Sequence, residues 1–240
     1  MNFFYLMQQE FRRLIEEHSW QGEVVRVGVK TLTPEEAIGN PEDRDYPLIK
    51  GRERMMEAEF LGSRGQAFTD MYGEFSGTLA EVGDMELKNN YRRAIFLASL
   101  NAVARHLAIV EKTIHCKDFE PPKCAKELVS YIRQHYGQPR VALVGLQPRM
   151  AEALAKEFEL RVTDMDPENV GTRKFGIDIQ GPEHTAGNIA WSDLALVTGS
   201  TLTNDTLRAL LTEKPTVLFG VTIAAPAHFL NLKRFCPYGT

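Results

Sequence analysis

The chain has 240 residues, a net charge of −4 and 43% hydrophobic residues. These values exclude a disordered, collagen-like or coiled-coil protein and allow one large domain or two small ones. Neither half of the chain is basic, so we expect no nucleic-acid partner. Three cysteines are too few for a disulfide framework and suit a reducing compartment. The N-terminus lacks a signal-peptide pattern and no apolar run is long enough to span a bilayer, so we expect a cytoplasmic protein without a membrane partner.

The first part of the chain, residues 1–112, combines helical and extended patterns. Apolar side chains recur at helical spacing over 2–18 and 86–110, whereas residues 23–31 alternate like a strand. Residues 56–81 indicate two or three further strands, and the proline-containing stretch before them indicates an irregular connection. Consecutive strands with helices around them predict an α+β domain with an antiparallel sheet.

The pattern changes after residue 112. Residues 113–124 contain two adjacent prolines and are predicted to be a linker. Short apolar strands are then expected to alternate with helices. Such alternation predicts a doubly wound parallel sheet over residues 113–240, so the chain is expected to be α/β overall with two domains, 1–112 and 113–240. The expected strands are 140–145, 159–166, 192–201 and 215–222, and the expected helices are 124–137, 148–158 and one within 202–213.

Ligands of an open parallel sheet bind beyond the carboxyl ends of its strands. The turn after the first strand, 145–150, has one glycine where the dinucleotide fingerprint requires three. Asp164 lies 19 residues after Gly145, close to where a ribose-binding carboxylate would fall. Asp164 is therefore either a partner of a nucleoside or S-adenosylmethionine-like ligand or a solvated strand end.

A hydroxyl-rich stretch follows the third strand. Backbone N–H groups at a helix start attract anions, and hydroxyls add donors. This stretch is expected to bind a carboxylate, a phosphate or a metal-bound ligand, unless its hydroxyls only cap a helix. In the long helix of the first part, Asn101 lies on the apolar stripe and must either bind a neighbouring strand or face a cleft between the halves. The expected ligand-binding residues are Thr198, Gly199, Ser200, Thr201, Asn204, Thr206, Asn101 and Asp164.

Imidazole and thiol groups gather in the linker. His115, Cys116 and Cys124 are the types of donor that zinc, copper or nickel prefer, and Cys236 joins them only if the fold brings it close. Their spacing matches no standard zinc finger or ribbon, and the alternative is that the thiols are small buried side chains. The chain has no nucleophile elbow, no H-E-x-x-H, no Walker motif and no kinase signature, so the catalytic residues are unknown.

Four stretches together resemble the putative heavy-metal chelation family of unknown function. They are GSRGQAFTDMYGEFSGTL, SLNA, IHCKDFEPPKCAKEL and VTGSTLTNDTLRALL. The resemblance implies an N-terminal domain like that of enolase, a C-terminal Rossmann-like domain and a ligand site in the cleft between them. It points to Gly199, Ser200, Thr201 and Asn204, with Asn101 on the other side. The sequence departs from the family at RFCPYG, where a glycine- and valine-rich continuation and a further strand are implied.

Two functions follow from these features. The first is binding or chelation of a heavy metal or metal complex between the domains, with a transition-metal ion or a small anionic ligand as partner. The alternative is an enzyme that uses S-adenosylmethionine or a nucleotide, such as a methyltransferase. Whether the chain is an enzyme is left open. A homodimer is expected only because it is the commonest oligomer.

Overall fold

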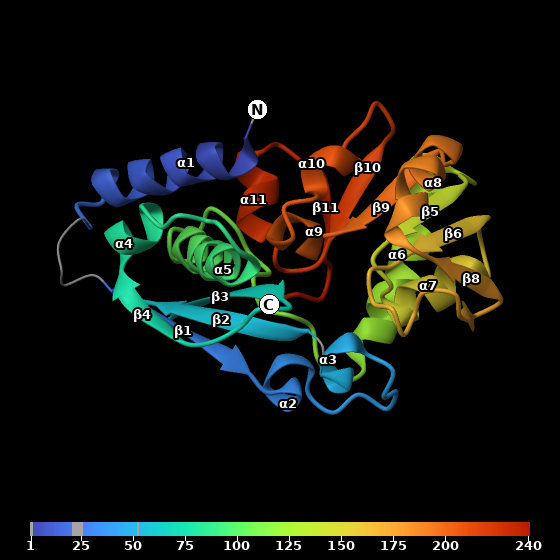
Figure 1. The fold of residues 1–240 in the computed structure, drawn as a ribbon, viewed down its shortest axis with the longest axis horizontal. Helices are drawn as coiled ribbons and strands as arrows, with labels where there is room; N and C mark the ends of the chain where they lie inside the picture. Colours follow the sequence, from blue (N-terminus) through green and yellow to red (C-terminus); the bar gives the residue numbers. More distant parts are fainter. Residues whose placement is uncertain (1, 21–25, 52) are drawn as a thin grey trace.

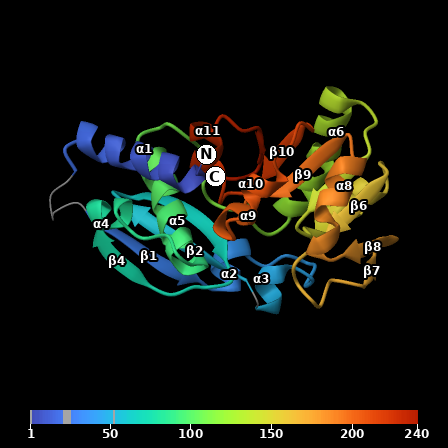
Figure 2. The same cartoon turned by 45° about the horizontal axis from the view of Figure 1, so that its top comes forward.

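The computed structural model describes residues 2–20, 26–51 and 53–240. It contains a four-stranded sheet with the order β3 (Ser63–Thr69), β2 (Arg54–Phe60), β1 (Arg26–Leu32) and β4 (Phe75–Thr78). A seven-stranded sheet has the order β11 (Arg234–Phe235), β10 (Thr216–Phe219), β9 (Leu194–Thr198), β5 (Val141–Val144), β6 (Leu160–Thr163), β8 (Ile177–Gln180) and β7 (Arg173–Lys174). Figure 1 shows the two sheets side by side, and Figure 2 shows the same arrangement after a 45° turn. The predicted mixed α/β class is confirmed at this level. Over the described residues, no helix has both the length and the apolar character needed to cross a membrane.

The four-stranded sheet is antiparallel, as predicted, and all its strands precede residue 79. Helix α5 lies directly on β3, and this contact requires Gly65. A Cβ at Gly65 would lie 2.3 Å from the backbone nitrogen of Ala102 and 2.5 Å from the carbonyl oxygen of Ala98. The part of the predicted first strand at residues 23–25 lies outside the described residues. The elements are α1 (Phe3–Glu17), β1 (Arg26–Leu32), β2 (Arg54–Phe60), β3 (Ser63–Thr69), β4 (Phe75–Thr78), α4 (Leu79–Gly83) and α5 (Asn90–His106).

The connection between β1 and β2 was expected to be irregular but contains two short helices, α2 (Pro34–Ile38) and α3 (Pro47–Lys50). Thr33 caps α2. Its hydroxyl accepts from the backbone N–H of Glu36 at 3.2 Å, and the Glu36 carboxylate accepts from the backbone N–H of Thr33 at 2.9 Å. Each helix has a proline in its first turn, where the missing N–H costs nothing. The prolines therefore start helices here rather than interrupt them.

The seven-stranded sheet is parallel except for the antiparallel pair β7 and β8. The four predicted strands are present in shortened form, whereas β7, β8 and β11 were not predicted. Two of these unpredicted strands have only two residues each, too few to show a period. The elements are α6 (Glu120–Tyr136), β5 (Val141–Val144), α7 (Pro148–Ala155), β6 (Leu160–Thr163), β7 (Arg173–Lys174), β8 (Ile177–Gln180), a 3-10 turn (Pro182–His184), α8 (Thr185–Trp191), β9 (Leu194–Thr198), α9 (Ser200–Thr203), α10 (Leu207–Leu210), β10 (Thr216–Phe219), α11 (Ala224–Phe229) and β11 (Arg234–Phe235).

One local prediction for this half was wrong. The helix expected within 202–213 is instead the pair of four-residue helices α9 and α10, separated where Asp205 adopts a φ of 58°. A left-handed residue cannot continue a right-handed helix. The first two residues of the RFCPYG stretch form β11, which pairs with β10 through the register Leu218↔Arg234.

One hydrophobic cluster joins the two halves. It extends from Phe11 of α1 and Phe96 of α5 to Val197 of β9 and Ile223 before α11. A second cluster fills the space between α6, α7 and the seven-stranded sheet. The loops at the carboxyl ends of β9 and β10 are therefore packed against the helix of the first half, which positions the candidate site.

Candidate functional site

The carboxyl ends of β9 and β10 face α5 and β3, and Figure 1 shows α9 and α11 lying between them. Asn101 of α5 is the centre of this contact and is fully buried. Its side-chain NH2 donates to the carbonyl oxygens of Gln66 at 3.0 Å, Val221 at 3.1 Å and Thr222 at 3.2 Å. Its Oδ1 accepts from the backbone N–H of Ala225 at 2.8 Å. Asn101 thus binds β3 and the first turn of α11, and both its amide nitrogen and its amide oxygen are already hydrogen-bonded to the protein backbone.

The parallel sheet reverses its strand order at β5, which pairs with β6 on one side and with β9 on the other. Gly145 follows β5 with a φ of +87°, and a Cβ there would lie 2.5 Å from Cγ2 of Thr198. Only glycine adopts this conformation at no steric cost and leaves space for the threonine. The turn after β5 and the end of β9 therefore meet closely, at the position where open α/β sheets bind ligands.

The hydroxyls predicted to bind a ligand have mixed roles. Thr201 donates to the carbonyl oxygen of Thr198 at 2.6 Å, and Thr206 donates to that of Thr201 at 3.1 Å. These two hydroxyls stabilise the turn. Thr198 Oγ1 and Ser200 Oγ lie 3.2 Å apart and form a pair at the end of β9. Gly199 donates its N–H to Phe219 in β10 at 2.9 Å. Because α9 has only four residues, the expected strong helix dipole is missing here.

Asn204 contacts the first half directly. Its Oδ1 accepts from Nδ2 of Asn90 at 3.1 Å, and Asn90 also donates to Asp70 at 2.6 Å. Arg93, one turn further along α5, donates to the carbonyl oxygen of Thr203 at 2.6 Å. Asn90, Asp70 and Arg93 were not predicted as site residues. The only signal in the sequence is the Asn-Asn pair at the start of the long helix, which predicts a cap rather than a contact between halves.

Carboxyl groups gather beside this contact. Burial raises the pKa of Glu53 to about 7, and the nearby carboxylates of Asp164, Asp70 and Asp166 raise it further. Burial lowers the pKa of Lys174, and the positive charge of Lys50 lowers it further. The carboxylates of Asp45, Asp164 and Asp166 act in the opposite direction. Carboxylates of both halves therefore lie within electrostatic reach of one another. A position with this character favours a cation over an anion.

Asp164 lies at the end of β6, as predicted, but its carboxylate holds its own loop. Oδ2 accepts from the backbone N–H of Leu146 at 2.6 Å. Oδ1 accepts from the N–H of Asp166 at 2.8 Å and from the amide of Asn169 at 3.2 Å. The three hydrogen bonds join the loops after β5 and β6.

The predicted metal donors lie at the junction of the halves. The Nδ1 atom of His115 lies 2.6 Å from the carbonyl oxygen of Cys116, and burial lowers the pKa of the imidazole. Burial raises the pKa of the Cys116 thiol to about 12, and burial followed by the charge of Cys116 raises the pKa of the Cys124 thiol. Within residues 2–20, 26–51 and 53–240, no three His, Cys, Asp or Glu side chains are already arranged to hold a metal ion.

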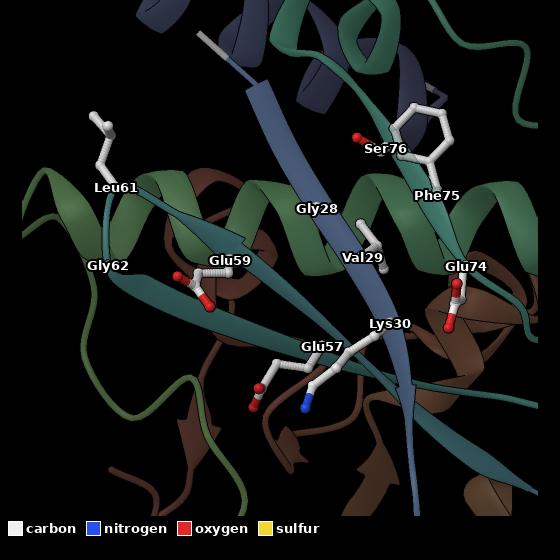
Figure 3. A pocket seen from close by; sticks show the side chains of 10 residues that line it. All are labelled: Gly28, Val29, Lys30, Glu57, Glu59, Leu61, Gly62, Glu74, Phe75 and Ser76. Carbon is white, nitrogen blue, oxygen red and sulfur yellow. The ribbon is translucent and has the colours of Figure 1, made fainter.

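A hollow of about 810 Å³ lies elsewhere, on the face of the four-stranded sheet that α5 leaves open. Figure 3 shows Lys30, Glu57 and Glu59 on this face. Lys30 pairs with Glu36 at 3.1 Å, and Glu57 accepts from Gln66 at 2.7 Å, so Lys30 and Glu57 already have partners. The hollow contains none of the predicted site residues.

Comparison with known proteins finds similarity to one family over part of the chain. The sequence pattern of the DUF364 family, described as "Putative heavy-metal chelation", matches residues 128–232. No curated protein matches the chain. A DUF364 protein of unknown function from Pyrococcus horikoshii has a TM-score of 0.56 at 15% identity, covering 92% of this chain and 79% of its own. A second, from Desulfitobacterium hafniense DCB-2, has a TM-score of 0.52 at 15% identity, covering 74% and 72%. These two likenesses show similarity of fold. Over residues 128–232 the chain carries the DUF364 pattern, and the family resemblance predicted from its motifs is confirmed.

Proposed function

We propose that this protein binds a thiophilic heavy-metal ion where its two halves join, through His115, Cys116 and Cys124. The observation that carries the proposal is the state of His115. The carbonyl oxygen of Cys116 can only accept, so the 2.6 Å contact places the imidazole proton on Nδ1. Nε2 then keeps its lone pair, as in histidines that bind metals while a backbone carbonyl orients the ring.

The two thiols match the same chemistry. All the cysteines of the chain are free, and thiolates are the preferred ligands of soft and borderline ions. Their raised pKa values mean that a metal ion must displace protons when it binds, so affinity is expected to fall in acid. A reducing location such as the cytoplasm would keep these thiols available.

The polar contact between the halves is proposed to bind the groups that accompany the metal ion when it arrives as a complex. Ser200 and Asn204 offer a hydroxyl and an amide on one side, and Asn90 and Asp70 lie on the other. The carboxylates around Glu53 favour a cationic or metal-bound ligand over the free small anion expected from the hydroxyl-rich stretch. The other predicted residues, among them Asn101 and Thr201, are proposed to position this surface.

We also propose that residues 1–112 and 113–240 are separate domains, enolase N-terminal-like and Rossmann-like. Each sheet is built from one half alone. Counted in chain order, the parallel strands β5, β6, β8, β9, β10 and β11 have the order 6-5-4-1-2-3, which is that of a dinucleotide-binding sheet. The alternative function, an S-adenosylmethionine- or nucleotide-dependent enzyme, has less support because Asp164 already accepts three hydrogen bonds from its own loops.

The test uses the full chain, purified without a metal-chelating tag and kept reduced. Competition with a chromophoric chelator measures its affinity for zinc and cadmium. The variants His115→Gln, Cys116→Ser and Cys124→Ser should each weaken binding on the order of 10- to 100-fold. His135→Gln is the matched control, because Nδ1 of His135 also contacts a backbone carbonyl, at 2.9 Å from Tyr131, but the ring is exposed. Wild-type affinity in all three junction variants would exclude this site.

A further inference from the structure

A loop of the first half lies against the first turn of α7 in the second half. Residues 40–46, which we call the acidic loop, lie between α2 and α3 and contain Glu42, Asp43 and Asp45 beside a single basic residue, Arg44. Figures 1 and 2 both show the segment between α2 and α3 reaching toward the second half. Because α7 follows the turn after β5, the acidic loop lies beside the position where open α/β sheets bind ligands.

Arg149, in the first turn of α7, joins the acidic loop to the second half. Its Nη1 lies 3.0 Å from Oδ2 of Asp43, and its Nη2 lies 2.8 Å from Oδ2 of Asp45. Glu152, one turn further along α7, pairs with the same guanidinium at 3.0 Å. The guanidinium carbon also lies over the ring of Phe175, 5.6 Å from its centre. Three carboxylates and one aromatic ring thus hold a single positive charge between the halves.

Both ends of the acidic loop are anchored. At its start, the backbone N–H of Asn40 donates to the carboxylate of Asp118 at 2.8 Å. At its end, Tyr46 is 5% exposed and packs in a hydrophobic cluster with Leu48. Between these anchors the loop carries the two carboxylates that pair with Arg149. Release of Arg149 would therefore free a short segment, residues 41–45, while both halves stay folded.

The attraction between Arg149 and the acidic loop is opposed by buried polar atoms. Among the described residues, Nε of Arg149, Oδ1 of Asp45 and the hydroxyl of Tyr46 are buried without a hydrogen-bond partner. Buried polar atoms of this kind cost free energy, which exposure to water recovers. The side chain of Arg149 is 13% exposed, whereas those of Asp43 and Asp45 are 43% and 38% exposed. Salt therefore reaches the carboxylates and can screen the pairs.

We propose that the acidic loop is a strap that Arg149 holds closed against the first turn of α7, and that the strap opens when salt screens its ion pairs. In the closed state the carboxylates of Asp43 and Asp45 bind the guanidinium. In the open state these groups face water, and the first turn of α7 becomes accessible from this side. The strap is a conformational device of the fold and goes beyond the proposed function, because it involves none of the proposed metal-binding residues.

The test is limited proteolysis of the full chain with trypsin, because Arg44 is exposed in the middle of the strap. Mass spectrometry of the fragments measures the rate of cleavage after Arg44 alone. Division by the rate for a synthetic peptide of residues 38–49 removes the effect of salt on the protease. For the wild type we expect cleavage on the order of 10-fold faster in about 1 M than in about 0.01 M sodium chloride. Arg149→Gln should be cleaved rapidly in both.

Two further variants separate the strap from a general loss of charge. Arg133→Gln is the matched control, because Arg133 forms its ion pair with Glu157 inside the second half, and its rate should equal that of the wild type. The double variant Asp43→Asn with Asp45→Asn removes the same pairs from the loop side. Because these substitutions alter the cleavage site itself, hydrogen exchange of residues 148–151 is measured instead, and it should be faster than in the wild type.

Equal rates of cleavage after Arg44 in the wild type and in Arg149→Gln at low salt would overturn the strap. A wild-type rate that does not change with salt would overturn it as well. Near-ultraviolet circular dichroism of each variant checks that it is folded. If Arg149→Gln is unfolded, the salt dependence of the wild type still decides the question.

Discussion

Asn101 and Ala225 join the two halves of the protein. The side-chain oxygen of Asn101 in α5 accepts the backbone N–H of Ala225 in α11 at 2.8 Å, in a position fully shielded from water. Its NH2 group donates hydrogen bonds to three carbonyl oxygens at the same time. A single side chain thus satisfies backbone groups of β3 and of the segment that leads into α11.

Replacing Asn101 should therefore destabilise the whole molecule. Asn101→Ala removes the side-chain acceptor of the Ala225 N–H and the donor to three carbonyl oxygens, and we expect a loss of about 2–4 kcal/mol in the free energy of unfolding. Asn101→Asp should be at least as harmful, since a carboxylate cannot donate to the carbonyls. Urea unfolding measures both. Gln9→Ala, in which an exposed amide is removed from α1, is the control and should change the free energy by less than about 0.5 kcal/mol. A value for Asn101→Ala similar to the control would contradict the role given to this residue.

Gly145 should not tolerate a side chain. Gly145→Ala combines a left-handed backbone, φ +87°, with a contact of 2.5 Å to Thr198, and we expect a loss of about 2–4 kcal/mol. Gly137→Ala separates the two effects, because Gly137 has a φ of +74° and nothing within 4 Å of the added Cβ. It should lose only about 1 kcal/mol. Thermal unfolding compares the variants, and the double variant Gly145→Ala with Thr198→Ser should recover part of the loss. No recovery would show that the methyl contact is not the cause.

Glu53 should make stability depend on pH. Its folded-state pKa, about 7, lies above the ordinary glutamate value of 4.5, because burial and then the charges of Asp164, Asp70 and Asp166 disfavour its ionised form. Between these two values the folded chain binds more protons than the unfolded chain, so stability contributed by this group falls as the pH rises from about 4.5 to about 7. Glu53→Gln should remove this dependence, so its gain in stability over the wild type should be larger at pH 8 than at pH 5. Unfolding midpoints at both values measure the effect, with exposed Glu35→Gln as control. A wild-type curve without this slope would contradict the prediction.

The sequence predicted the two sheets better than it predicted the contacts between the halves. Short apolar runs such as 140–145 and alternating runs such as 23–31 are local signals and marked most strands. Asn101 was recognisable because a polar side chain on an apolar stripe must find partners. In contrast, Asn90 and Arg93 look like ordinary residues at the start of a helix, and their contacts with Asn204 and Thr203 depend on how the halves pack. The hydroxyls of 198–206 predicted the start of one helix, but the left-handed backbone of Asp205 divides the segment into two short helices.

The reciprocal pairing of Ile114 with Thr240 has a consequence for biosynthesis. Together with the bonds from Asn101 to residues 221–225, it means that α5 and the connecting segment find several of their hydrogen-bond partners in residues 221–240. An emerging N-terminal half on the ribosome therefore has its own sheet and helix but an uncovered face on α5. We expect its final packing to follow the synthesis of residues 221–240, so that folding of the two halves ends in one common step.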